Sequence, residues 1–130
     1  MKLLKSFYPI LFTVISLLFI TGCGVADGGK VTAKEVLKQN PEADILQYNG
    51  FIYNNVTHAE WFEQEKEQHI KHNLLGEIKK QSTSSFGFKD LSTTKLPIGT
   101  KIYSTNENEL GIIIVEYEGK DLYYMQLIKS

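Results

Sequence analysis

The stretch Asp44-Ile45-Leu46-Gln47-Tyr48-Asn49-Gly50-Phe51-Ile52-Tyr53-Asn54 carries the clearest fold signal in the chain. It places Asn-Gly between two apolar runs, and this dipeptide favours a two-residue type I′ turn because both central positions need a positive φ. Such a turn sets Tyr48 opposite Phe51 and Leu46 opposite Tyr53, so that all four side chains share one face. The stretch therefore predicts an antiparallel hairpin with an aromatic cluster.

A second hairpin is predicted near the C-terminus, from Gly111–Tyr117 and Asp121–Ile128 around Glu118-Gly119-Lys120. Residues 112–115 are apolar at every position, which indicates a central strand covered on both faces. A loop of Glu118-Gly119 would set Glu116 opposite Asp121, an unfavourable pair of like charges. The register of this hairpin is left open for that reason.

Two helices are predicted. Thr32 is a suitable N-cap for a short helix over 33–39, which Asn40-Pro41 would end. Thr57-His58-Ala59-Glu60 has the form of a capping box and predicts a long helix that runs to about Asn73. Its apolar members Trp61, Phe62 and Ile70 would dock only its two ends, because the middle is too polar to be buried.

The remaining segments complete a small domain. Residues 77–81 suggest an edge strand, 82–95 a long polar loop, 96–99 a tight turn, 100–104 another strand, and 106–109 another turn. We expect an α+β fold: an antiparallel sheet of four to six strands, one long helix and one short N-terminal helix, preceded by a signal-peptide helix. A single domain over residues 32–130 is expected.

The N-terminus has the three parts of a secretory signal. Lys2 and Lys5 precede the apolar run 10–20, and Ile20-Thr21-Gly22-Cys23 follows. An apolar residue, two small residues and a cysteine describe a site cleaved between Gly22 and Cys23. We expect residues 1–22 to be removed and residues 23–31 to form a flexible tether.

Cleavage at that point would set the net charge of the mature chain and leave it with one cysteine. The mature chain would carry 12 of the 14 lysines against 15 acidic residues, and the sequence has no arginine. A balance of about −3 argues against nucleic-acid binding and against a polybasic lipid-binding patch. Cys23 is the only cysteine, so no disulfide can form within the chain.

Few residues suggest a catalytic or metal-binding site. On the predicted long helix, Glu65, His69 and His72 fall on one face, and carboxylate with imidazole is a possible metal set, although the spacing is not that of a zincin. His58 is no better a ligand. Glu116 and Glu118 are better explained as solubilising charges than as an acid–base pair. There is no nucleophile elbow, and Gly28-Gly29-Lys30 lacks the context of a phosphate loop. We expect no enzyme activity and no cofactor.

Phe86 and Phe88 are the outliers of the polar loop 82–95. Exposed aromatic side chains on a loop often anchor a partner. In the alternative, the loop folds back and both rings tuck under the sheet.

Residues 1–23 resemble the precursors of bacterial lipoproteins, on the residues of the cleavage site above. Residues 31–128 look like small uncharacterised lipoproteins of low-GC Gram-positive bacteria. The second resemblance is carried by three segments: Asn40-Pro41-Glu42-Ala43-Asp44-Ile45, Tyr48-Asn49-Gly50-Phe51-Ile52-Tyr53 and Leu96-Pro97-Ile98-Gly99-Thr100-Lys101-Ile102-Tyr103. The first resemblance implies S-diacylglycerol on the Cys23 thiol and an N-palmitoyl group on its amine; acylation of the amine is left open.

The resemblance implies a protein anchored by lipid at the outer face of the cell membrane. Some small lipoproteins of this kind act in exclusion on conjugative elements. We therefore expect a tethered interaction or inhibitory protein, exclusion- or immunity-like, whose partners are the membrane and a neighbouring envelope protein. The alternative is an accessory lipoprotein that binds a small ligand or a metal, at the aromatic hairpin or at the Glu65, His69 and His72 set.

Overall fold

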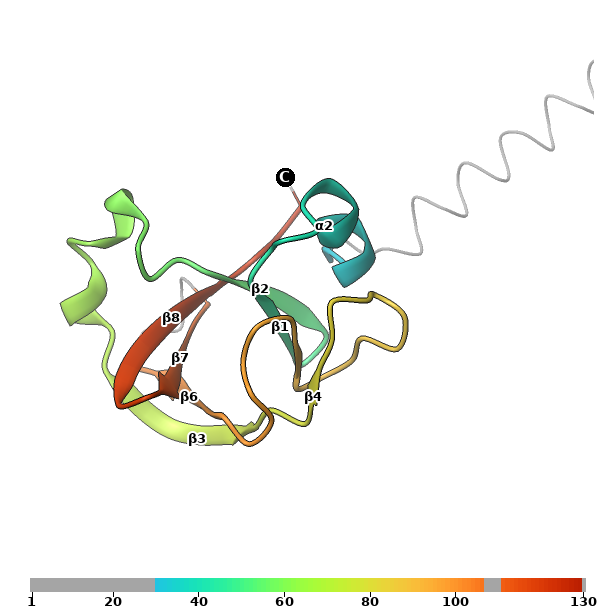
Figure 1. The fold of residues 1–130 in the computed structure, drawn as a ribbon. Coiled ribbons are helices and arrows are strands. Elements are labelled where there is room, and N and C mark those ends of the chain that lie inside the picture. The colour runs from blue at the N-terminus through green and yellow to red at the C-terminus, as the bar shows by residue number, and fades with distance from the viewer. Residues whose placement is uncertain (1–29, 107–110, 130) are drawn as a thin grey trace, which may run out of the picture.

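The computed structural model describes residues 30–106 and 111–129. These residues form one curled eight-stranded mixed sheet, a half-barrel, with a single short helix beside it (Figure 1). The elements in chain order are α2 (Ala33–Gln39), β1 (Ile45–Tyr48), β2 (Phe51–Asn55), the 3₁₀ turns η1 (Glu60–Phe62) and η2 (Lys66–Gln68), β3 (Lys71–Glu77), β4 (Lys80–Gln81), β5 (Ser92–Thr93), β6 (Lys101–Thr105), β7 (Ile112–Tyr117) and β8 (Lys120–Gln126). The predicted signal peptide, Cys23 and most of the predicted turn 106–109 lie outside the described residues.

The strand order β3-β6-β7-β8-β2-β1-β5-β4 explains the curl. β3 and β4 stand at opposite ends of this order, yet only Ile78 and Lys79 separate them in the chain. The amide of Ile78 donates to Thr100, which precedes β6, at 2.8 Å, and the amide of Lys79 donates to Leu91, which precedes β5, at 2.9 Å. One continuous segment thus passes from one edge of the sheet to the other, and the sheet has to bend to allow it.

The predicted fold class is wrong. The described chain has a half-barrel where a small sheet with one long helix was expected, and β4 pairs with β5 in parallel rather than antiparallel. The prediction failed chiefly at two places. The expected helix over 57–73 is absent, and the supposed loop 82–95 contains β5.

Local hydrogen bonds explain why residues 57–73 are not helical. Thr57 does not cap a helix, because its hydroxyl accepts from the amide of Tyr123 at 2.8 Å and bonds to the side chain of Asn55. The segment instead makes two separate 3₁₀ turns, η1 and η2, and then enters β3, which pairs with β6. A polar helix with no apolar stripe to bury gains little from tertiary packing, so strand pairing prevails.

Other sequence-based predictions are confirmed. α2 spans 33–39 with the Thr32 hydroxyl as its N-cap. β1 and β2 form the predicted hairpin, with positive φ at Asn49 and Gly50, and Tyr48 lies opposite Phe51. β7 is buried from Ile112 to Val115 and lies between β6 and β8.

The core lies mainly on one face of the curled sheet. Its largest cluster joins side chains from β1, β2, β6, β7 and β8 with two from the connecting segments, which places it on the concave face: Leu46, Tyr53, Ile78, Leu96, Ile102, Ile113, Val115 and Tyr124. Two smaller clusters cover other faces. Ile45 and Ile52 pack with Ala33 and Leu37 of α2, and Phe62 packs with Val56 and Ile112.

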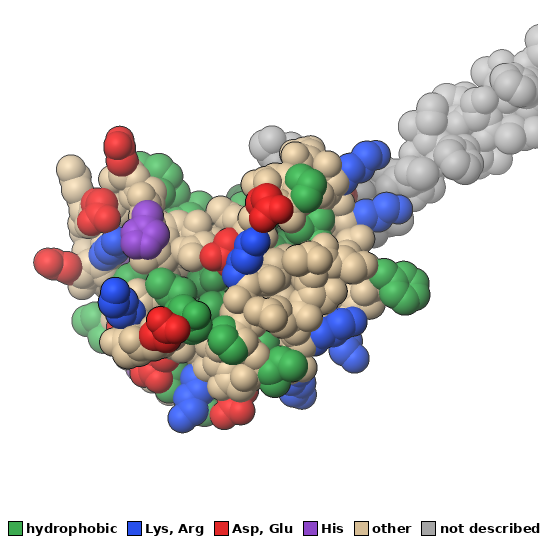
Figure 2. Space-filling model, in the orientation of Figure 1, with side chains coloured by type: hydrophobic (Ala, Val, Ile, Leu, Met, Phe, Trp, Pro, Cys, Tyr) green, Lys and Arg blue, Asp and Glu red, His purple; other side chains and the backbone are tan. Residues whose placement is uncertain are grey.

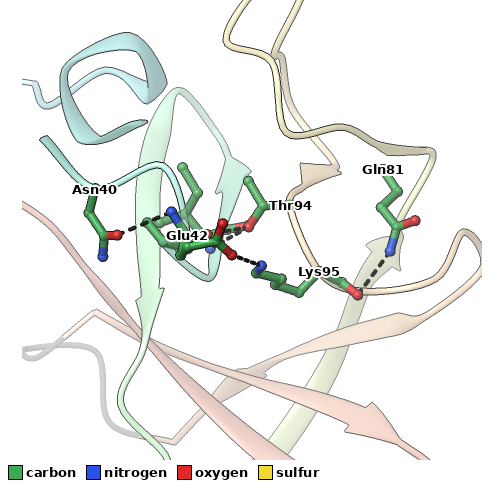
Figure 3. Close-up of polar contacts among 7 residues, drawn as sticks. Asn40, Glu42, Gln81, Thr94 and Lys95 are labelled. Atoms are coloured by element: carbon green, nitrogen blue, oxygen red, sulfur yellow. Dashed lines mark hydrogen bonds and ion pairs between the residues drawn. The ribbon is translucent and has the colours of Figure 1, made fainter. Parts of the chain in front are cut away.

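Side chains as well as the backbone fix the edge formed by β1, β5 and β4 (Figure 3). The Thr94 hydroxyl donates to the carbonyl of Ala43 at 2.7 Å and accepts from the amide of Ile45 at 3.0 Å. Next to it, Gln81 donates to the carbonyl of Lys95 at 2.9 Å, and Lys95 pairs with Glu42 at 3.2 Å. These polar contacts hold a short, largely non-aliphatic strand that sequence periodicity could not reveal.

Candidate functional site

The proposed metal set does not come together. Glu65 precedes η2, His69 follows it and is buried, and His72 is exposed on β3, so the common helix face on which the set depended does not exist. Within residues 30–106 and 111–129, no group of three His, Cys, Asp or Glu side chains could hold a metal ion. His58 is exposed in the loop before η1. The set was a candidate only because a helix would have placed its members on one face, and that helix is absent.

His69 instead belongs to the packing of the sheet's outer face. Its ring lies nearly parallel to that of Phe62, with centroids 5.5 Å apart, and Phe62 in turn lies 5.4 Å from Tyr123 of β8. His69 is 4% exposed, and neither of its ring nitrogens has a hydrogen-bond partner in the structure. Its role is in packing, because its ring stacks on that of Phe62 within the same 57–70 segment.

Glu116 takes part in a structural ion cluster. The β7–β8 turn has positive φ at Glu118 and Gly119, and it sets Glu116 opposite Asp121, the like-charge register that sequence left open. Lys71 of β3 relieves the repulsion because its ammonium pairs with both carboxylates, that of Asp121 at 3.0 Å. The hydrogen bond to Glu116 raises the pKa of Lys71, and the same bond lowers the pKa of Glu116. A carboxylate held ionised in this way is a poor general acid.

A partly buried polar network joins β2, β8 and the residue before β1, and it was not predicted. The Tyr124 hydroxyl donates to Asp44 at 2.8 Å, and the Asn55 amide donates to the other oxygen of Asp44 at 2.8 Å. Burial raises the pKa of Tyr124, which is fully inaccessible. Because no substrate can reach that hydroxyl, the network stabilises the fold and is not a reaction centre.

Two segments each present a large aromatic side chain to solvent, Trp61 in one and Phe86 in the other. The first is the distal segment, Thr57–Ile70, which lies at the end of the sheet away from α2 and Lys30 (Figure 1). Phe62 is fully buried there, while its neighbour Trp61 is 56% exposed and Ile70 is also exposed. The Trp61 ring stands edge-on to Phe62, with centroids 5.7 Å apart. The buried ring therefore holds the segment in place, and the indole is left available.

The second is the tip loop, Ser82–Leu91. The structure separates the two rings singled out from the sequence: Phe86 is 89% exposed, whereas Phe88 is half-buried against the cluster beneath α2. Two serine hydroxyls order the loop, because Ser82 accepts from the amide of Ser84 and Ser84 accepts from the amide of Phe86. Phe86 is therefore the ring that remains available to a partner, and Phe88 contributes to packing beneath α2.

Asp90 attaches the tip loop to the first hairpin. Its carboxylate accepts from the Gly50 amide at 2.9 Å and from the Gln47 side chain at 3.0 Å. The bond from the Gly50 amide is the largest cause of its lowered pKa. Sequence inspection missed this contact, since 40 residues separate Asp90 from Gly50.

An open groove of about 590 Å³ runs between α2 and the C-terminal end of β8. Its lining mixes polar side chains such as Glu35, Gln39 and Asn54 with apolar ones such as Val36 and Leu127. The aromatic hairpin proposed as a ligand site mostly faces the core: Leu46 and Tyr53 are buried in the large cluster, and Tyr48 and Phe51 pack against it. A small ligand would therefore find more room in the groove than at the hairpin.

No family model, curated protein or solved structure matches this chain. Within the described residues, no helix is long and apolar enough to cross a membrane.

Proposed function

We propose that this chain is a membrane-anchored interaction or inhibitory protein. Lipid on Cys23 holds it at the outer face of the cell membrane, and the distal segment binds a neighbouring envelope protein. The observation that carries the proposal is the exposure of Trp61 beside a fully buried Phe62. Tryptophan is among the residues that contribute most to protein interfaces.

The position of the distal segment supports this function. The described chain begins at Lys30, beside α2, and the distal segment lies at the other end of the sheet (Figure 1). An anchor upstream of Lys30 leaves that end free to meet the exposed part of a membrane protein. Each buried methylene of the acyl chains contributes about 0.8 kcal/mol, so two or three chains on Cys23 hold the protein firmly.

Site-specific photocrosslinking tests the interaction. A photoreactive side chain placed at position 61 of the full chain, in its own membranes, is expected to give one discrete crosslinked product. The control position is Ile98, which is 69% exposed in the turn before β6 and outside the distal segment. Equal or diffuse products from positions 61 and 98 contradict the proposal.

The anchor has a separate test. Mass spectrometry of the N-terminal peptide of the membrane-extracted chain should find Cys23 as the first residue, with diacylglycerol on its sulfur. An unmodified cysteine, or a chain that still starts at Met1, excludes the anchor. This result does not bear on the crosslinking, so the two halves of the proposal fail independently.

The groove beside α2 favours a second candidate function, an accessory lipoprotein that binds a small ligand. Its volume lies within the ordinary range of ligand sites, and polar contacts are offered by Glu35, Gln39, Asn40 and Asn54. A ligand that binds only the folded state raises the melting temperature. Thermal-shift screening against small polar metabolites tests this candidate, and a uniformly flat response excludes it.

A further inference from the structure

The tip loop and the start of the described chain meet at one end of the domain. A shallow cavity of about 360 Å³ is lined by Ser85 and Phe88 from the loop and by Lys30 to Lys34 from the chain entry. Phe86, which lies between Ser85 and Phe88 in the loop, is therefore near Lys30, where the described chain begins. Cys23 precedes Lys30 by seven residues, so a lipid on it lies within about 25 Å of Lys30 at full extension.

Four lysines lie on segments next to Phe86 at this end. Lys30 and Lys34 line the shared cavity, the Lys80 ammonium donates to the carbonyl of Gly87 at 3.4 Å, and Lys89 is three residues further along the loop. Within the described residues, none of these four lysines is in a salt bridge. The Lys30 ammonium does lie 4.8 Å from the centroid of the Phe51 ring, and its charge helps to lower the pKa of Asp90. In Figure 2, acidic side chains gather mainly over the other end of the domain.

Two acidic groups at this end have partners of their own, and the four lysines outnumber them. Asp90 accepts hydrogen bonds from the Gly50 amide and the Gln47 side chain, and Glu35 pairs with Lys129 at 3.3 Å. The overall negative balance of the mature chain therefore hides a locally positive surface. This surface is assembled from residues 30, 34, 80 and 89, and a count along the sequence does not reveal it.

We propose that the tip loop docks on the anionic surface of the membrane that holds the anchor, with Phe86 inserted among the lipid headgroups and Lys30, Lys34, Lys80 and Lys89 facing lipid phosphates. The inference rests on the proposed anchor at Cys23. A phenyl ring suits the membrane interface, and lysines near an anionic leaflet are attracted to it. The geometry adds that the ring is already directed outward, since the serine turns of the loop fix it there.

The occupant is a lipid surface and not a second protein, for two reasons. The chain outside the described part brings the predicted lipid close to this end, so the membrane is its nearest surface. The four lysines also lie on segments next to a single projecting ring rather than a broad apolar face, which matches charged headgroups more closely than a protein interface.

Tryptophan fluorescence quenching tests the proposal. Trp61 is the only tryptophan, so the chain with Trp61→Phe and Phe86→Trp carries a single reporter at the tip. This chain and the unsubstituted chain, each in its processed form, are reconstituted in vesicles of phosphatidylcholine with or without phosphatidylglycerol. The lipids are brominated near the headgroup end of the acyl chains.

The expected result is loss of fluorescence for the reporter at position 86, greater with phosphatidylglycerol, and none for Trp61 at the distal end. Replacing Lys34 and Lys89 by glutamine should remove the phosphatidylglycerol dependence. Replacing Lys101 and Lys120, which are exposed elsewhere, should leave it unchanged. An unquenched reporter at position 86 in vesicle-bound chain, or equal quenching at positions 61 and 86, overturns the proposal.

Vesicle flotation of the same samples separates the two proposals. Chain that floats with both vesicle types while position 86 stays unquenched retains the anchor and refutes the docked tip. Chain that fails to float refutes the anchor, and with it the premise of the docked tip.

Discussion

The distal segment and the tip loop lie at opposite ends of the sheet and arrange their aromatic side chains in the same way. Each is a polar segment with two aromatic side chains, and each packs one ring against the fold and exposes the other: Phe62 and Trp61 in the distal segment, Phe88 and Phe86 in the tip loop. The comparison shows that a buried aromatic can serve to position an exposed one. It also separates residues that stabilise the fold from residues available to partners.

The two segments differ in their attachment. The distal segment is held by neutral groups, since the Thr57 hydroxyl joins Asn55 and the amide of Tyr123. The tip loop is held by a carboxylate, that of Asp90. Their surroundings differ in charge as well, because lysines lie on segments next to Phe86, whereas two acidic residues, Glu60 and Glu63, flank Trp61 and Phe62 in sequence.

The largest expected effect is the loss of the buried ring in the distal segment. Phe62→Ala should lower the free energy of unfolding by about 3–5 kcal/mol, because it leaves a cavity between Val56, Ile112 and Tyr123. Phe88→Ala, at a half-buried position, should cost roughly half as much or less. Urea unfolding followed by circular dichroism gives both values. Equal losses for the two variants would mean that both rings anchor their segments equally firmly, contrary to this expectation.

The next effect has the opposite sign. His69→Leu should raise the free energy of unfolding by about 1 kcal/mol, since it removes two buried ring nitrogens that lack hydrogen-bond partners. The same urea titration measures it, with His58→Leu at an exposed position as the control. A destabilised His69→Leu chain would show that the imidazole makes a polar contact the structure lacks, with a buried water for example.

His69 illustrates which features of the structure could be predicted from the sequence and which could not. Local signals with a direct backbone cause were read correctly: the Asn49-Gly50 turn, the Thr32 cap and the buried run Ile112 to Val115. The capping pattern at Thr57 misled, because the hydroxyl is taken by Tyr123, which is 66 residues away. The shared face of Glu65, His69 and His72 was lost with that helix, whereas Phe62 is buried as expected.

Long-range assembly explains what sequence did not reveal. β3 and β5 contain few apolar residues, and pairing with β6 and β1 gives them their place. The unusual position of Phe86 was visible from its polar neighbours. Its lysine surroundings were not, because they come from α2, the chain entry and two parts of the β4–β5 region.

A smaller effect distinguishes the attachment through Asp90 from that through Thr57, because only the first depends on pH. The lowered pKa of Asp90 means that folding favours its carboxylate, so this stabilisation is fully present above the unfolded-state pKa and is lost as pH falls through the folded-state pKa. Asp90→Asn should cost about 1 kcal/mol at neutral pH, a modest value because the residue is exposed.

The difference between the Asp90→Asn chain and the unsubstituted chain should shrink as pH falls below about 4, the ordinary range for aspartate. Hydrogen exchange at the Gly50 amide reports the loss locally, with the Tyr123 amide of the neutral attachment as the internal control. Parallel loss of protection at both amides would show that acid loosens the whole sheet and not the tip loop alone.

The smallest stability changes are expected at the two exposed rings. Trp61→Ala and Phe86→Ala should each alter the free energy of unfolding by less than about 0.5 kcal/mol, because neither fills space in the core. Their effects on binding should nevertheless be distinct. With the photoreactive side chain placed at position 70 instead of 61, Trp61→Ala should abolish the crosslinked product. The same substitution should leave vesicle binding intact. Phe86→Ala should weaken phosphatidylglycerol-dependent docking and leave that product unchanged. If either substitution impairs both readouts, the two ends act as one surface, and the division between a membrane end and a partner end is wrong.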